Sequence, residues 1–340
     1  GHMWPNVAMP NATTPAQYIL ILIDLAEQQG CARERLLAGT SLTESGLERI
    51  GARVEDRDFT RLALNALTLT GRPDLGLDLG MRLNLGAHAI LGQAFMTCSN
   101  LGEAIELFIK YHHLLSSSLE VSITDDGDHC RFTSVDTPYD LPPHFSHELL
   151  YSTFLNTLRG LLNMPNLQMQ VDLPYSPPEH AERYQQVFGD NVRFDRAEGG
   201  VRFDARLMQA PLPSSNPALR KLYQQECARL LADLEEDSSI GQQTHRLLRK
   251  LEGQYPQMPQ IAQMLNLSPR TYRRRLEEEG ESFQGLLDKV RAEHATHYLR
   301  NTRLPLSTIA YRVGLNDTSN FRRAYHKWTG RTPREVRHGD

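Results

Sequence analysis

“QIAQMLNLSPRTYRRRLEEEG” (residues 260–280) and “TIAYRVGLNDTSNFRRAYHKW” (residues 308–328) repeat one pattern 48 residues apart. Matching positions carry similar side chains: Ile261 and Ile309, Ala262 and Ala310, Leu265 and Val313, Leu267 and Leu315. One added residue in the second copy then aligns Tyr272 with Phe321 and Leu276 with Tyr325. A short pattern that recurs in this way indicates one structural unit built twice.

The order of residues in each copy predicts two short helices joined by a tight turn. A small alanine near the start lets one helix approach another closely, and the Asn266 position, which is glycine in the second copy, accepts the backbone of a tight turn. Ser268 then caps a new helix that starts with Pro269, because proline lacks the N–H that the first helical turn leaves unpaired. In the second copy, Asn316 or Asp317 supplies the cap. Each copy therefore predicts a helix-turn-helix unit.

The second helix of each unit has an apolar face and a basic, polar face. Tyr272 and Leu276 lie one turn apart and face inward, which leaves the neighbouring arginines outside. Arginine donates paired hydrogen bonds to guanine in the major groove and is attracted to phosphate. Glutamates 277–279 are expected to point away from the duplex or to pair with arginines. The residues that we expect to bind DNA are Ser268, Arg270, Thr271, Arg273, Arg274, Thr318, Ser319, Arg322 and Arg323.

The net charge of −4 hides a division along the chain. From Arg246 to the end, 18 lysines and arginines face ten acidic residues, a balance of +8 that leaves −12 for the rest. A basic part in an acidic chain indicates contact with a polyanion, although a solvated basic surface would have the same composition. Together with the two arginine-bearing helices, this division favours double-stranded DNA as a partner.

The segment between the two units, “SFQGLLDKVRAEHATHYLRNTRLPLS” (residues 282–307), predicts a long connector helix. Ser282 caps it, and its buried face comes from Phe283, Leu286, Leu287, Val290 and Leu299. A stiff connector would let the two second helices enter successive major grooves on one side of the DNA, about 34 Å apart. One chain could then read a site that a simple helix-turn-helix protein covers as a dimer.

Before the basic part, helical and extended segments are mixed. Helical periodicity covers residues 15–29, 56–70, 101–115 and 143–163, with Asp56 and Asp58 as capping residues of the second segment. Residues 118–136 change to a period of two on either side of Asp126-Gly127, which predicts a β-hairpin. Short strands are expected near 167–173, 191–195 and 200–204. The predicted fold is an α+β sensory domain with a small sheet, followed by an all-α domain of two helix-turn-helix units joined by a connector helix.

Two connectors mark the boundary between these domains. “QAPLPSSNP” (209–217) is rich in proline and serine, and “DLEEDSSIG” (233–241) is acidic. Between them a helix gathers Leu219, Leu222, Cys227, Leu230 and Leu234 near one face, which we interpret as a bridge or a dimer contact. The predicted organisation is a tag remnant and flexible N-terminus (1–14), a ligand-sensing or dimerisation domain (15–210), a linker with a helix (211–240) and a DNA-binding domain (241–340).

Length and composition limit the classes of protein to which this chain can belong. The chain has 340 residues, of which 40% are hydrophobic and 23% charged, as in an ordinary globular protein of two domains. Its longest apolar run, “YILILIDLA” (18–26), is too short to cross a membrane, and nothing resembles a signal peptide. Four cysteines stand singly without a CxxC pair, which fits a reducing compartment. We therefore expect a cytoplasmic protein with no membrane contact.

The sequence gives no positive indication of an enzyme. GxSxG, P-loop and GxGxxG motifs are absent. In “HFSHE”, His144, His147 and Glu148 could hold a metal ion, but Tyr151 stands where the zinc-protease motif needs its second histidine. We expect hydrogen-bonded or exposed histidines here, with no catalytic residue, no metal ion and no cofactor.

The repeat and the end of the chain resemble a known family. “IAYRVGLNDTSNFRRAYHKWTGRTPREVR” (309–337) is similar to the second helix-turn-helix and C-terminal signature of the AraC/XylS family of bacterial transcription regulators, and residues 257–280 resemble the first. Leu315 and Asn316 depart from the phenylalanine and the serine or aspartate that are usual there. Three upstream stretches resemble the domain called arabinose-binding in the subfamily of ornithine-utilisation regulators: “LLAGTSLTESGL”, “TGRPDLGLDLGMRL” and “NLGEAIELFIKYHHLL”.

The resemblance implies a one-component regulator. Its N-terminal domain would sense a small molecule or dimerise, and its C-terminal domain would bind promoter DNA and contact RNA polymerase, usually as an activator and a homodimer. The domain name does not establish arabinose as the ligand. The alternative is a DNA-binding regulator whose N-terminal domain is only a dimerisation or protein-interaction module, without a chemical effector.

Four residues are candidates for effector binding: Tyr111, His112, His147 and Tyr151. His112 lies on the same helical face as several apolar residues, where a polar ring is either a ligand contact or a hydrogen-bonded core group. The leucine and phenylalanine content there suits an apolar or amphipathic effector, while the family resemblance also allows an amino acid.

Overall fold

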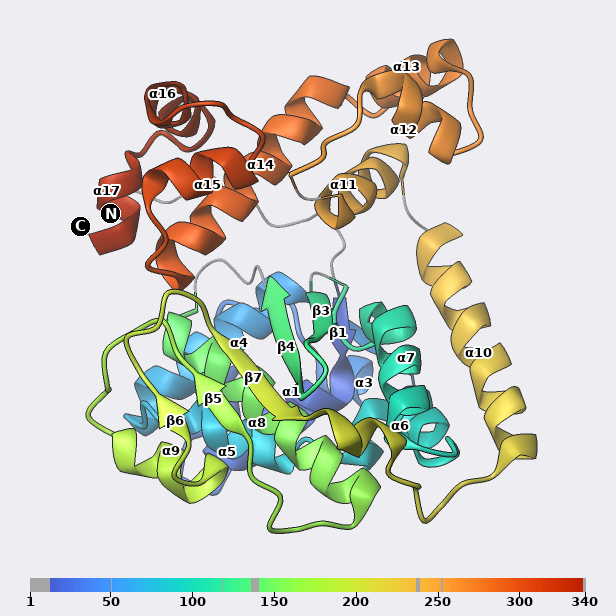
Figure 1. Cartoon of the computed structure of the whole chain (residues 1–340), viewed down its shortest axis with the longest axis vertical. Helices are drawn as coiled ribbons and strands as arrows, with labels where there is room; N and C mark the ends of the chain where they lie inside the picture. Colours follow the sequence, from blue (N-terminus) through green and yellow to red (C-terminus); the bar gives the residue numbers. More distant parts are fainter. Residues whose placement is uncertain are drawn as a thin grey trace. The chain divides into compact units, whose positions relative to one another are not determined.

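The computed structural model describes residues 13–49, 51–117, 119–135, 141–236, 239–251 and 253–338. The chain divides into two compact units, one ending at Leu231 and one beginning at Ala232. The first is an α+β unit with a small sheet and the second is helical, as predicted (Figure 1). The predicted tag remnant lies outside the described residues, whereas Thr13 and Thr14, expected to be flexible, belong to a strand. No helix among the described residues is long and apolar enough to cross a bilayer.

The first unit alternates helices with short strands. Up to the hairpin, its elements are β1 (Thr13–Pro15), α1 (Ala16–Glu27), α2 (Arg33–Leu36), α3 (Glu44–Leu47), β2 (Arg53–Glu55), α4 (Asp56–Thr70), α5 (Leu75–Arg82), η1 (Leu85–His88), α6 (Ala89–Met96), α7 (Leu101–Tyr111) and η2 (His112–Leu114). The remainder is β3 (Glu120–Asp125), β4 (His129–Val135), α8 (Pro143–Leu162), β5 (Gln170–Asp172), α9 (Ala181–Phe188), β6 (Val192–Arg193), β7 (Gly200–Asp204), η3 (Ala205–Gln209) and α10 (Pro217–Glu236), whose end passes into the second unit. The predicted helices and strands are confirmed, except that the helix expected over 101–115 continues beyond Tyr111 only as a 3-10 turn.

A five-stranded sheet, in the order β3-β4-β7-β5-β6, forms one layer of the first unit. All neighbouring strands are antiparallel except β5 and β6, and the predicted hairpin pairs Asp125 with Cys130. Helices α7 and α8 pack on this sheet through phenylalanines. Phe132 of β4 stacks on Phe154 of α8 with ring centroids 4.4 Å apart, and Phe108 of α7 lies 6.0 Å from Phe132. This aromatic layer forms part of the core between helices and sheet.

The predicted capping of α4 is wrong in detail. Its N-cap is Glu55, which makes no side-chain capping bond. Asp56 instead accepts a hydrogen bond from Thr14 Oγ1 at 2.9 Å, and Asp58 accepts one from the Ser41 backbone N–H at 3.1 Å. Both carboxylates remain in the first helical turn, where the helix dipole favours negative charge. Tertiary partners have therefore replaced the local capping bonds that the sequence suggested.

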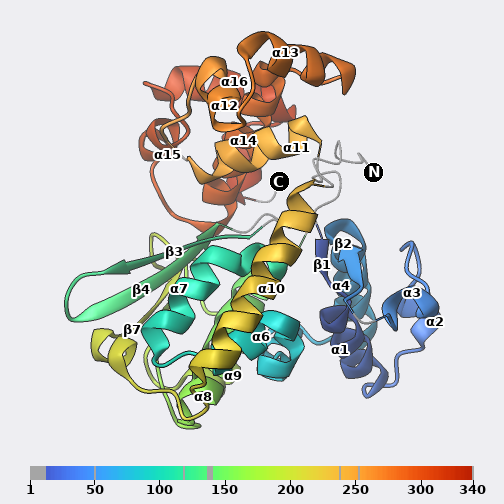
Figure 2. The same cartoon turned by 90° about the vertical axis from the view of Figure 1, so that its right-hand side faces the viewer.

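The apolar residues of α10 do not share one face. Cys227 is buried, whereas Leu219 and Leu222 are 41% and 60% exposed. An advance of about 100° per residue places Leu222 and Cys227 roughly 140° apart, which is too wide for a single stripe. Helix α10 runs beside α7 (Figure 2), and Arg220 forms an ion pair with Glu103 of α7. Helix α10 is therefore tied to the first unit on one side and exposes leucines on another.

The second unit consists of seven helices within its described residues. They are α11 (Ile240–Lys250), α12 (Met258–Met264), α13 (Pro269–Glu278), α14 (Phe283–Asn301), α15 (Leu306–Arg312), α16 (Thr318–Thr329) and α17 (Pro333–His338). Two small cores hold them together, and α14 contributes to both. Leu286, Leu287 and Val290 enter the first core, while Ala295, Tyr298 and Leu299 enter the second. The predicted connector helix is thus the element common to both helix-turn-helix units.

The two predicted turns have matching geometry. Asn266 and Gly314 both adopt positive φ, 54° and 74°. In each copy the residue that follows closes the turn onto the alanine five positions earlier: Leu267 N–H donates to Ala262 and Leu315 N–H to Ala310, both at 2.9 Å. Asparagine tolerates this backbone better than most residues, and glycine adopts it without strain. The internal repeat read from the sequence is therefore a repeat of structure.

Candidate DNA-binding surface and effector cavity

Helix α13 starts as the sequence predicts. Ser268 is its N-cap and accepts the Thr271 N–H at 3.2 Å, Pro269 is the first helical residue, and the Ser268 and Thr271 hydroxyls are 2.9 Å apart. Ser268 and Thr271 are therefore engaged in the cap at the helix N-terminus. Capping leaves other N–H groups of this first turn outside the helical bonds, and such groups suit a phosphate.

The basic face of α13 is open. Arg270, Arg273 and Arg274 are all exposed, and Arg274 lies 3.7 Å from Glu278 in a solvated pair that contributes little stability. On the opposite face, Tyr272 and Leu276 are fully buried, as expected. The Tyr272 hydroxyl shares a 2.8 Å hydrogen bond with Thr244 of α11, which fixes the rotation of α13 about its axis.

Helix α16 has the same construction. Asp317 is the N-cap and accepts the Asn320 N–H at 2.8 Å, which decides between the two predicted capping residues. Phe321 and Tyr325 are buried, and the Tyr325 hydroxyl is 2.7 Å from that of Thr296 in α14. Each recognition helix is thus anchored by one tyrosine–threonine hydrogen bond to the helix beneath it.

Polar side chains line the outer face of α16. Ser319, Arg322 and Arg323 are exposed and Thr318 is half-buried. Arg323 donates to the Asn320 side chain at 2.7 Å. Figure 1 shows α13 and α16 on either side of α14, within one unit. The structure therefore brings the nine residues predicted to bind DNA to two helices of similar build.

One of the three consecutive glutamates has a role that the sequence did not reveal. Glu279 accepts the backbone N–H groups of Ile240 and Gly241, both at 2.8 Å. These groups belong to the first turn of α11, where a carboxylate is favoured by the helix dipole. Glu278 pairs with an arginine, as predicted, but Glu279 joins the end of α13 to the start of α11.

Buried charged groups join α11 to α14. His245 Nε2 lies 2.8 Å from Glu293 Oε1, and Arg249 Nε lies 3.9 Å from Glu293 Oε2. Burial by itself would raise the pKa of Glu293, but His245 and Arg249 outweigh it and hold that pKa below its ordinary value. Burial lowers the pKa of the adjacent His294 to about 3, and its Nδ1 shares a 2.8 Å hydrogen bond with Tyr255. These contacts position the first helix-turn-helix unit on α14.

The first unit contains a partly open cavity of about 140 Å³. Most of its lining is aliphatic or aromatic, including Phe95, Phe108, Phe132, Phe154, Ile105, Leu101, Leu115, Leu119, Leu158 and Leu161. The cavity therefore lies against the aromatic layer between α7, α8 and the sheet. Its described lining contains one acidic residue, Asp56, and neither lysine nor arginine.

A short chain of hydrogen bonds reaches this cavity. Tyr18 hydroxyl lies 2.6 Å from His88 Nδ1, and His88 Nε2 lies 3.0 Å from Thr157 Oγ1. All three residues line the cavity. Burial lowers the pKa of His88 to about 4, so the imidazole is neutral near pH 7. Sequence reasoning missed this group because nothing in “NLGAHAI” distinguishes His88 from an ordinary core histidine.

None of the four predicted effector-binding residues lines this cavity. Tyr111 is buried, and His112 Nδ1 donates to the Ile109 carbonyl at 2.9 Å, both near the end of α7. On α8, the His147 ring lies edge-on to Tyr151, 5.4 Å between centroids. The structure places these residues in two separate groups, and their role in effector binding stays a prediction.

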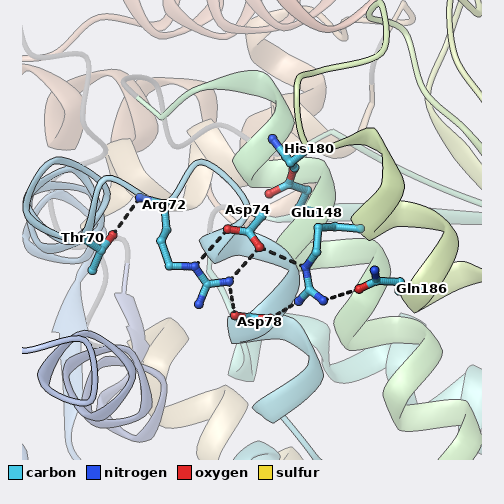
Figure 3. A network of polar contacts seen from close by, with 8 residues as sticks. Thr70, Arg72, Asp74, Asp78, Glu148, His180 and Gln186 are labelled. Atoms are coloured by element: carbon cyan, nitrogen blue, oxygen red, sulfur yellow. Dashed lines mark hydrogen bonds and ion pairs between the residues drawn. The ribbon is translucent and has the colours of Figure 1, made fainter.

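A polar network joins α5 to α9 (Figure 3). Arg183 donates to Asp74 at 3.0 Å and to Asp78 at 2.7 Å. Arg72 lies 2.7 Å from each of the same two carboxylates. Two arginines and two aspartates compensate each other, so this is a structural clamp rather than a vacant anion or cation site.

The residues of “HFSHE” do not converge on a common point. The Glu148 side chain is fully buried, accepts a 2.6 Å hydrogen bond from Tyr184 and lies 2.6 Å from His180 Nε2 (Figure 3). His147 packs instead against aromatic rings. Oε1 of Glu148 is thus bound from α9 and from His180 at its N-cap, and within the described residues His144, His147 and Glu148 form no metal-ligand group.

Two family models match the chain. Residues 30–212 match the arabinose-binding domain of AraC transcription regulators, N-terminal, and residues 261–339 match a helix-turn-helix domain. The ornithine utilization regulator of Pseudomonas aeruginosa is 35% identical over 95% of this chain and 96% of its own length. The HTH-type transcriptional regulator VirS of Mycobacterium tuberculosis is 30% identical over 78% of each chain.

A solved structure is also similar, that of the transcriptional regulator CdpR from Pseudomonas aeruginosa, with 24% identity, a TM-score of 0.44 and coverage of 94% of this chain and 98% of that one. The relatives named here are transcription regulators and not enzymes. The matched domains and the ornithine utilization regulator together cover both units. The chain therefore belongs to the AraC family of transcription regulators, as a DNA-binding regulator with an arabinose-binding-type N-terminal domain.

Proposed function

We propose that this chain is a one-component activator that acts in the bacterial cytoplasm: a small molecule binds the cavity of the first unit and controls promoter binding by the second. The observation that carries the proposal is the presence, in one chain, of a largely apolar cavity and of two arginine-bearing recognition helices on a shared support. Contact with RNA polymerase and the activator role are inferred from family membership. Transcription from a target promoter with purified polymerase tests both, and an unchanged transcript level would contradict them.

The exposed arginines of α13 support sequence-specific recognition. Arg273 and Arg274 follow the buried Tyr272 in the middle of the helix, where side chains of a recognition helix reach base edges. Guanidinium groups that donate two bonds to guanine contribute about 1–3 kcal/mol of discrimination. Arg303 is also exposed, but it lies between α14 and α15, outside both recognition helices, so it is not expected to read base edges.

The lining of the cavity supports an apolar or amphipathic effector. The described lining contains no arginine or lysine that could pair with a carboxylate of the effector. Burying such a charge without a partner is costly. The neutral His88 and its two hydroxyl partners can exchange a hydrogen bond with one polar group of a ligand. The relative's name refers to ornithine utilization. For this chain we propose an uncharged molecule, largely hydrocarbon, with one or two hydroxyl or carbonyl groups.

The exposed leucines of α10 support a homodimer. Leu219 and Leu222 lie on a helix whose other side is held by the first unit. Exposure of two apolar side chains one turn apart to water is unfavourable, and a second copy of the helix could cover them.

Arg273→Ala is expected to cost about 1–3 kcal/mol of binding free energy on the preferred operator and to relax the preference at one base pair. Arg303→Ala, the matched control, should weaken all sequences alike or have no effect. Binding of each variant to the operator and to its single-base variants, at fixed salt, measures this difference. A uniform loss with Arg273→Ala, at unchanged sequence preference, would make this arginine a phosphate contact.

Ala104→Leu is expected to abolish effector binding, because Ala104 lines the cavity and three added carbon atoms would occupy it. Glu106→Leu adds an apolar side chain on the exposed side of the same helix and serves as control. A ligand that binds only the folded state at 100 times its Kd stabilises by about 2.7 kcal/mol. Thermal shifts of the protein with medium-chain alcohols, methyl ketones, ornithine and arabinose would identify the chemical class of the effector. The proposal is contradicted if no compound raises the melting temperature of the unsubstituted protein, or if a compound raises that of Ala104→Leu equally. Either result favours the alternative, an N-terminal domain that serves only for dimerisation or protein interaction.

Leu222→Glu is expected to shift the full chain from dimer to monomer at tens of micromolar, because two glutamates would meet in the proposed contact. Lys221→Glu, at a neighbouring exposed position, controls for the change in charge. Sedimentation velocity measures the distribution. A monomeric unsubstituted protein at this concentration would contradict the homodimer.

A further inference from the structure

Three potential metal-ligand atoms meet where η2 approaches β3. The donor atoms of His112, His113 and Glu120 all lie within 4.8 Å of one another. His113 Nε2 is 3.2 Å from Glu120 Oε1, and His112 Nε2 is 3.8 Å from Glu120 Oε2. The two imidazole rings stand side by side with centroids 4.2 Å apart. Both histidines are 5% exposed, so the cluster is largely shielded from water.

The hydrogen bonds of His112 prepare its outer nitrogen to act as a ligand. Nδ1 donates to the Ile109 carbonyl at 2.9 Å, which leaves the lone pair on Nε2. Nε2 is buried and makes no hydrogen bond. A histidine ligand commonly donates its second ring N–H to a backbone carbonyl in this way, which fixes ring orientation and tautomer. The lone pair of His112 is therefore held toward a carboxylate oxygen, an arrangement that a cation between them would stabilise.

We propose that His112, His113 and Glu120 bind one divalent transition-metal ion of the zinc class. Two imidazole nitrogens and one carboxylate oxygen suit zinc and its neighbours, whereas calcium and magnesium prefer oxygen ligands. Metal–nitrogen distances of about 2.0–2.1 Å in a tetrahedral site imply donor separations of roughly 3.3 Å. The histidine nitrogens lie 3.8 and 3.2 Å from the two oxygens of Glu120, and the three donor atoms lie within 4.8 Å of one another, so side-chain adjustments of about 1 Å would bring them to this spacing.

The site would lie beside the proposed effector cavity. The Phe108 ring, which lines the cavity, lies 6.1 Å from the His112 ring. The ion would join the turn after α7 to the edge strand β3. Sequence spacing did not reveal the group, because Glu120 belongs to the next element and its approach to the histidines depends on the packing of β3.

Titration of the metal-free full chain with Co²⁺ tests the proposal. We expect visible absorption that saturates at one equivalent and is displaced by Zn²⁺, with Zn²⁺ also raising the melting midpoint. Glu120→Gln and His112→Gln should each weaken binding by at least about tenfold, given that losing even an outer-shell partner costs about 10–100-fold. His129→Gln, an exposed histidine on the adjacent strand β4, should leave the affinity unchanged.

Absence of saturable Co²⁺ binding to the unsubstituted protein would overturn the proposal, whatever the variants do. Equal affinities for the Glu120→Gln, His129→Gln and unsubstituted proteins would also overturn it. Far-UV circular dichroism checks that each variant is folded. If His112→Gln unfolds, Glu120→Gln, which preserves side-chain size, decides the outcome.

Discussion

The sharing of one helix between two hydrophobic cores is the constraint on which the DNA-binding unit depends. The first half of α14 packs with α11, α12 and α13, and its second half packs with α15, α16 and α17. Each recognition helix is anchored by a buried tyrosine whose hydroxyl shares a hydrogen bond with a threonine: Thr244 of α11 for α13, and Thr296 of α14 for α16. Helix α14 thus supports both recognition helices, because it contributes to the core beneath each of them and holds α16 directly and α13 partly through α11. The buried contacts of Glu293 specify the packing of α11 on the same helix, because an unpaired charge there would be costly.

Local chemistry made much of this unit predictable. Ser268, Pro269, Asp317 and the turn positions Asn266 and Gly314 act through backbone geometry within a few residues, and each appears as expected. The hairpin at Asp126-Gly127 is predictable for the same reason. Contacts between distant residues were not predictable. Asp58 accepts a hydrogen bond from Ser41 and does not cap its own helix, and Glu279 accepts hydrogen bonds from the first turn of α11. In both cases a partner distant in sequence replaces a local one.

The candidate effector site shows the limit of sequence reasoning more clearly. Residues that line a cavity come from several helices and a sheet, so helical periodicity identifies apolar faces without showing which of them leave space. The sequence places His112 on an apolar helical face, yet its ring lies toward Glu120, whereas Phe108 and Leu115 beside it line the cavity. His88, the polar group that does reach the cavity, carries no signal in its local sequence. If effector and DNA binding are coupled, the coupling is reciprocal, so operator DNA should strengthen effector binding by the same factor.

The central claim is that one rigid helix places two recognition helices for two successive major grooves. Insertion of about 5 bp, half a helical turn, between the two half-sites tests it most directly, since it rotates one groove to the far side of the duplex. The affinity of the full chain is measured for the unmodified operator and for operators with insertions of about 5 and 10 bp. Rigid placement predicts that both insertions lower the affinity to that of a single half-site, because α14 can neither rotate nor lengthen. Equal affinity for the unmodified operator and either inserted operator would contradict it.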